Sequence, residues 1–135
     1  MAAAATGRGR GPARERAFSL LYESTQRGIP VADVLAEEVV DTDPYTVAVL
    51  EGVESSRGAL DERIARFAKG WTLARMPIVD LIILRLASWE LTERDDIPTA
   101  VILNEAVELA NTYSTDDSGR FVNGVLSSIA SELRP

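Results

Sequence analysis

Residues 78–91 form the longest apolar stretch of the chain, and helical spacing makes this segment apolar on nearly every side. The stretch is interrupted by four polar residues: Asp80, Arg85, Ser88 and Glu90. Such interruptions are typical of a buried core helix and argue against a membrane-spanning one. Because a helix that is hydrophobic all round must be surrounded by other helices, the sequence predicts an all-α protein built around this segment.

The rest of the sequence predicts further helices and no convincing strand. A chain of 135 residues is long enough for one domain with a hydrophobic core. Asp43 fits the N-cap and Pro44 the first position of a long helix, and Asp116 and Asp117 fit the cap of the last one. The expected helices cover about residues 12–26, 31–39, 44–69, 77–91, 98–111 and 118–132.

The residue types exclude several classes of function. The chain has no cysteine and no histidine, so it lacks a disulfide framework, the usual zinc ligands and the commonest general base. We therefore expect neither an enzyme nor a bound metal or cofactor. Nothing resembles a targeting or membrane segment, so we expect a cytoplasmic protein. Three acidic pairs are interpreted as a helix face and helix caps: Glu37-Glu38, Asp95-Asp96 and Asp116-Asp117.

Charge is distributed unevenly along the chain. Residues 1–16 contain four arginines and one glutamate, a net charge of +3 within a chain whose net charge is −7. The glycine-rich residues 1–11 are expected to be disordered. A basic segment on an acidic body is typical of an anion-binding arm. The alternative is a solvated tail whose arginines serve only solubility.

Glycines occur inside two of the predicted helices. Gly52 and Gly58 lie in the helix over residues 44–69, and Asn123 and Gly124 stand side by side in the last helix. A glycine in a helix interior costs about 1 kcal/mol relative to alanine. A close approach by a neighbouring helix, or a bound partner, would account for glycine at these positions.

Several stretches together resemble the NusB family of transcription antitermination factors. The most specific are Asn104-Glu105-Ala106 and Phe121-Val122-Asn123-Gly124 near the C-terminus. The others are residues 13–17 with Leu21-Tyr22, Trp71 with Arg75, and residues 79–91. The resemblance implies an all-helical fold with a flexible basic arm, residues 1–11, and a single domain, residues 12–135. That domain would consist of two packed helical subdomains, residues 12–70 and 71–135.

The resemblance also implies a function in transcription. NusB proteins bind boxA, a short single-stranded RNA element in leader transcripts, notably those of ribosomal RNA. They do so together with NusE, a ribosomal small-subunit protein, and the complex joins elongating RNA polymerase with other Nus factors. Some members self-associate, which leaves a homodimer open. Many relatives have an unbroken arginine run in the arm, whereas Gly9 and residues 11–13 interrupt it here.

Two sets of site residues follow from the resemblance. The RNA-binding set is Arg8, Arg10, Arg14, Arg16, Tyr22, Arg120 and Phe121. The NusE-binding set is Arg75 and Asp80. Guanidinium groups suit phosphate because their donors are forked and always charged. An aromatic ring at a helix N-terminus suits an unstacked base. Burial of Tyr22 and Phe121 in the core is the alternative.

Other polar and aromatic residues are interpreted first as internal. Arg85 is expected to form an ion pair with Glu90 or Glu105, because a charge in an apolar helix needs a partner. Asn104, Glu105 and Asn123 are expected to bond across a helix interface. For Trp71, anchoring a partner and packing between the subdomains both remain open.

Two other classes of protein are alternatives. One is the RNA-binding domain of a ribosomal RNA cytosine methyltransferase, which has a similar Phe-Val-Asn segment. Such an enzyme would continue into a large cofactor-binding domain, so a chain ending at Pro135 favours the standalone factor. The other is a helical adaptor or oligomeric protein without RNA binding.

Overall fold

The structure is a computed structural model that describes residues 10–135, so Arg8 and most of the expected arm lie outside the described residues. Within them, the prediction of an all-α fold is confirmed, and no strand is present. The elements of the described part of the chain are α2 (Gly11–Arg27), α3 (Val31–Ala36), α4 (Pro44–Phe67), the 3-10 turn η2 (Leu73–Arg75), α5 (Ile78–Glu93), α6 (Thr99–Tyr113) and α7 (Ser118–Leu133).

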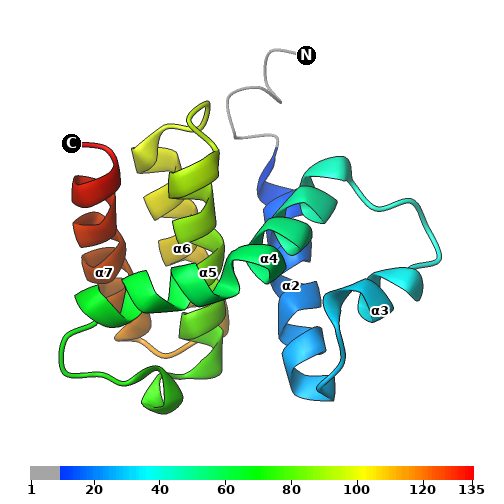
Figure 1. The fold of residues 1–135 in the computed structure, drawn as a ribbon, viewed down its shortest axis with the longest axis horizontal. Coiled ribbons are helices and arrows are strands. Elements are labelled where there is room, and N and C mark those ends of the chain that lie inside the picture. The colour runs from blue at the N-terminus through cyan, green and yellow to red at the C-terminus, as the bar shows by residue number, and fades with distance from the viewer. Residues whose placement is uncertain (1–9) are drawn as a thin grey trace.

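The long helix α4 joins the two sides of the molecule (Figure 1). Its first half packs against α2 and α3, and its second half crosses α5 and reaches α7. Helices α5, α6 and α7 pack against one another on the other side. The chain turns after α4 at Gly70, whose φ of 84° favours glycine. We propose this turn as the boundary between the two subdomains.

Helix α5 is the centre of the core, as its all-round apolar sequence predicts. It contacts α2, α4, α6 and α7. Six of its apolar side chains are almost completely buried: Ile82, Ile83, Leu84, Leu86, Ala87 and Leu91. Full burial of each of the larger ones stabilises the fold by about 1.5–3 kcal/mol.

The helix ends follow the predicted signals in part. The Asp43 carboxylate accepts a hydrogen bond from the Tyr45 amide and caps α4, as expected. The predicted cap of α7 is wrong, because Asp117 has helical backbone angles and makes no capping bond. Helix α3 ends at Ala36, earlier than expected. Val39, which the pattern placed on its apolar face, is exposed in the following loop.

Two glycines lie at close helix crossings. A Cβ on Gly52 would lie 2.1 Å from the Trp89 indole nitrogen, where α4 crosses α5. A Cβ on Gly119 would lie 2.4 Å from the Asn111 side-chain oxygen, where α7 meets α6. The close crossing expected at Gly58 is absent, because no atom lies within 4 Å of a Cβ there. Across the described residues, none of the helices combines the length and apolarity needed to span a bilayer.

Candidate nucleic-acid interface

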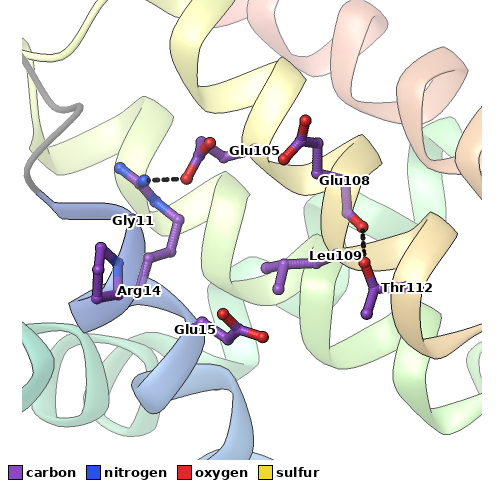
Figure 2. A pocket seen from close by; sticks show the side chains of 8 residues that line it. Gly11, Arg14, Glu15, Glu105, Glu108, Leu109 and Thr112 are labelled. Carbon is purple, nitrogen blue, oxygen red and sulfur yellow. Dashed lines mark hydrogen bonds and ion pairs between the residues drawn. The ribbon is translucent and has the colours of Figure 1, made fainter.

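The structure places Arg14 in the core and not in an exposed arm. Its side chain is 1% exposed, because position 14 lies on the buried face of α2. Nε donates hydrogen bonds to both carboxylate oxygens of Glu90, at 3.0 and 2.9 Å. Nη1 donates to Glu105 at 3.0 Å, the pair drawn in Figure 2. No RNA phosphate can replace these partners without opening the fold, so Arg14 is an internal ion-pair residue.

Glu90 is the fully buried carboxylate that holds this network together. Besides Arg14, it accepts a hydrogen bond from the Tyr45 hydroxyl. Burial and then the charge of Glu90 raise the pKa of Tyr45 far above its ordinary value, so the phenol remains a donor. Burial alone would lower the pKa of Arg14, but the hydrogen bond and charge of Glu90 more than offset this, and its pKa is raised. Both donors therefore stay protonated around one buried anion.

Arg10, the first described residue, is held against the turn between α5 and α6. Its Nη1 donates to the Asp96 carboxylate at 2.9 Å. Arg94 donates to the same carboxylate at 3.0 and 2.9 Å. Both guanidinium groups lie over the Tyr45 ring, 4.8 and 4.9 Å from its centroid. Hydrogen bonds from Arg94 and then Arg10 hold the pKa of Asp96 well below its usual range, so this carboxylate stays charged.

Arg134 fixes the same turn from the C-terminal end of the chain. Its guanidinium donates hydrogen bonds to the main-chain carbonyls of Glu90, Leu91, Arg94 and Ile97 and to the Thr99 hydroxyl. These carbonyls include the last ones of α5, which have no helical partner. Sequence reasoning missed Arg134, because a penultimate arginine gives no signal of what it contacts.

Two exposed tyrosines, Tyr22 of α2 and Tyr113 at the end of α6, lie next to Phe18. Tyr22 is 37% and Tyr113 is 44% exposed, so the core alternative for Tyr22 does not hold. Both rings pack on the buried Phe18, with centroids 6.5 and 5.1 Å from its own. The Tyr113 hydroxyl also donates a hydrogen bond to the Glu15 carboxylate. Arg16 is exposed and pairs with Glu38 at 2.6 Å. Sequence reasoning missed Tyr113, although its place at the end of an apolar helix is typical of a half-buried ring.

A second aromatic pair lies where the α4–η2 connection meets the start of α7. Trp71 is 48% exposed, and its ring centroid is 5.8 Å from that of the partly buried Phe121, with the planes tilted by 56°. Arg120 beside them is exposed. The sequence analysis proposed Arg120 and Phe121 as RNA contacts, which stays a prediction, and left the role of Trp71 open. About half of the Trp71 surface is therefore accessible to a ligand or partner.

Of the two residues expected to contact NusE, the structure leaves only Arg75 accessible. Asp80 is 2% exposed and accepts hydrogen bonds from the Ser114 hydroxyl at 2.6 Å and the Ser118 hydroxyl at 3.0 Å. It therefore ties the α6–α7 loop to the first turn of α5, and a basic residue of a partner cannot reach it. Arg75 is exposed at the end of η2.

The expectations for the internal polar residues hold only in part. Arg85 forms an ion pair, as predicted, but its partner is Asp61, whose two oxygens lie 2.7 and 2.9 Å away. The reason is that Arg85 lies on the face of α5 that packs against α4. Glu105 bonds across the interface of α2 and α6 to Arg14, as expected. Asn104 and Asn123 are exposed, so neither bonds across a buried helix interface.

Comparison with known proteins identifies this architecture. The NusB family profile matches residues 11–131. The transcription antitermination protein NusB of Arthrobacter sp. (strain FB24) is 47% identical over 130 residues, covering 93% of this chain and 95% of the relative. The corresponding protein of Saccharopolyspora erythraea is 50% identical over 127 residues, covering 90% and 86%.

Solved structures agree. T. maritima NusB superposes with a TM-score of 0.85 at 34% identity, covering 93% of both chains. A chain from a crystal structure of antitermination factors NusB and NusE in complex with dsRNA gives a TM-score of 0.77 at 25% identity, covering 93% of this chain and 98% of that one. Together these matches define the class as all-helical transcription antitermination factors. The chain belongs to the NusB family.

Proposed function

We propose that the chain binds boxA RNA in leader transcripts, notably those of ribosomal RNA, together with NusE, and joins elongating RNA polymerase with other Nus factors in the cytoplasm. The observation that carries this proposal is the set of arginine and aromatic side chains that reach the surface. Arg16, Tyr22 and Tyr113 are exposed, and Arg10 and Phe121 are partly exposed. Stacking rings with phosphate-binding cations are the usual means of holding single-stranded RNA.

The exposure of these side chains also decides which predicted residues stay in each proposed interface. Arg10, Arg16, Tyr22, Arg120 and Phe121 remain in the proposed RNA interface, together with Arg8 outside the described residues, and Tyr113 joins them. Arg75 remains the proposed contact to NusE. Solved relatives support both partners, because a NusB protein has been crystallised with NusE and RNA. The relatives are antitermination proteins of similar length, which favours this function over a methyltransferase domain.

The deciding experiment is binding of a labelled boxA-like RNA and a scrambled RNA, each with and without NusE from the same organism, over a range of salt concentrations. We expect selective binding that tightens with NusE. Arg16→Ala should weaken binding and reduce the salt slope by about 0.7, the value for one phosphate contact on a single strand. Arg27→Ala is the matched control, because Arg27 is an exposed arginine at the far end of α2 that pairs with Glu23 and Glu37.

Absence of selectivity even with NusE would contradict the proposal and favour the adaptor, for which self-association is the measurement to make. An equal loss of salt dependence in Arg16→Ala and Arg27→Ala would show that only overall charge matters. A homodimer that competes with RNA would appear in the same titrations as binding that weakens when the protein concentration rises.

Asp96→Asn should tighten RNA binding by about two- to five-fold, the range that corresponds to one exposed ion pair. The Asp96 carboxylate occupies the donors of Arg10, which an RNA phosphate would otherwise use. Asp95→Asn is the control, because its loss changes the net charge equally and this exposed neighbour forms no ion pair within residues 10–135. Equal tightening in both variants, measured by the same titration, would mean that Asp96 does not compete for Arg10.

A further inference from the structure

Gly124 is a helical glycine for which the fold gives no internal reason. No atom lies within 4 Å of a Cβ built on it, in contrast to Gly52 and Gly119, where a Cβ would collide with a neighbour. The close helix contact that the sequence offered as an explanation is therefore absent. A glycine in an exposed helix interior costs about 0.5–1 kcal/mol relative to alanine. Its missing side chain leaves open space only on the outer face of α7.

An open helical glycine is not by itself a site, as Gly58 shows. Gly58 is equally unobstructed, but it lies on an exposed face of α4. Gly124 differs because it forms part of a surface groove between the C-terminal end of α4 and α7. The groove is lined by Arg66, Lys69, Trp71, Arg120, Phe121 and Gly124, with further residues from the end of α4 and from α7.

The aromatic side of the groove is open to a stacking partner. Trp71 is half exposed and meets Phe121 at a tilt of 56°, so the two rings do not stack face to face. An exposed indole at the entrance of a groove presents a large, rigid surface that every nucleobase can stack on. Because Gly124 has no side chain, a ligand next to these rings can approach the α7 backbone closely.

The positive charge of the groove favours an anionic ligand. Arg66, Lys69 and Arg120 are exposed along it. Its only carboxylate among the described lining residues is Glu132, which Arg66 already neutralises at 3.2 Å. With Arg66 paired to Glu132, Lys69 and Arg120 supply the excess positive charge of the groove in a chain of net charge −7. Cations beside an exposed indole fit a nucleotide, which offers both a phosphate and a base.

We propose that this groove holds one nucleotide of single-stranded RNA, with its base stacked on Trp71 and its phosphate near Lys69 and Arg120. The inference rests on the proposed RNA-binding function and adds a subsite beyond Phe121. Trp71 is a base-stacking residue in it, and Gly124 is the residue that leaves room for the ligand.

The test uses the full chain, short boxA-like and scrambled single-stranded RNAs, and Trp71 as its own reporter. Trp89 is buried and contributes a constant background, so quenching of tryptophan emission on adding RNA reports on Trp71. We expect quenching by the boxA-like RNA. Trp71→Ala should weaken RNA binding by about five- to a hundred-fold, in line with loss of one stacked base, and Trp71→Phe should restore most of it.

Gly124→Ala and Gly58→Ala form the matched pair. Both substitutions meet no atom, so both variants should keep or raise the melting temperature. Only Gly124→Ala should weaken RNA binding and reduce the quenching. Equal RNA binding by the two variants, with unchanged tryptophan emission, would overturn the proposal even where boxA selectivity is found.

The remaining outcomes separate this inference from the proposed function. Quenching by both RNAs without boxA selectivity would support the nucleotide-binding groove and contradict the proposed boxA function. No binding to either RNA would contradict both proposals. If Gly124→Ala weakens binding of NusE but leaves RNA binding unchanged, the groove is a protein interface, and the nucleotide proposal is wrong.

Discussion

Replacing Arg14 with alanine is expected to lower the free energy of unfolding by about 3–5 kcal/mol, the cost of removing one partner of a buried ion pair. The substitution would leave Glu90, which is fully buried, without the guanidinium that balances its charge. Tyr45 would remain as its one donor in the network. The measurement is urea unfolding followed by circular dichroism, with the melting temperature as a second readout.

Arg16→Ala is the control for this prediction. Arg16 lies two residues further along the same helix, but it is exposed and its ion pair with Glu38 is at the surface. Its removal should cost no more than about 1 kcal/mol. The two variants should also separate in RNA titrations. At temperatures where Arg14→Ala remains folded it should bind RNA nearly as well as the unmodified chain, whereas Arg16→Ala should bind more weakly.

A double-substitution cycle shows whether the buried pair is the cause. Glu90→Ala should also be strongly destabilising, because it leaves the Arg14 guanidinium buried with only Glu105. Removing both charges together should cost several kcal/mol less than the sum of the two single losses. Additive losses, or a loss for Arg14→Ala as small as that for Arg16→Ala, would show that the pair contributes no more than a surface ion pair.

The contrast between Arg14 and Arg16 shows what sequence reasoning can and cannot predict here. Apolar periodicity, helix caps and proline positions predicted the helices and the central place of α5, because these signals are local along the chain. The burial of Arg14 depends on Glu90, which is 76 positions away. Within the basic segment, Arg10, Arg14 and Arg16 look alike in sequence, and only packing distinguishes them.

Asp80 and Trp71 show the same limit in the other direction. Asp80 stands at the start of a helix, where a carboxylate looks available to a partner. It is buried because Ser114 of the α6–α7 loop and Ser118 at the start of α7 donate hydrogen bonds to it. For Trp71 the sequence left open whether it anchors a partner or packs between the subdomains, and in the structure about half of its surface is exposed. Both outcomes depend on how distant loops pack against the ends of α5 and α7, which no local pattern contains.

The second large effect is expected at the crossing of α4 and α5. Gly52→Ala should destabilise the protein by about 1–3 kcal/mol, the usual cost of overpacking a core. The new Cβ would lie 2.1 Å from Nε1 and 2.3 Å from Cε2 of Trp89. An indole is rigid and this one is buried, so either the ring must leave its rotamer or the two helices must move apart.

Gly58→Ala is the matched comparison, because the same substitution in the same helix should raise the free energy of unfolding where Gly52→Ala lowers it. With no atom near its Cβ, this variant should gain about 0.5–1 kcal/mol from helix propensity. Urea unfolding of both variants measures the difference, and near-ultraviolet circular dichroism should show a changed Trp89 environment only for Gly52→Ala. In a Trp89→Phe background, whose smaller ring relieves the contact, Gly52→Ala should cost less. An undiminished cost there would mean that the indole is not what excludes a side chain at position 52.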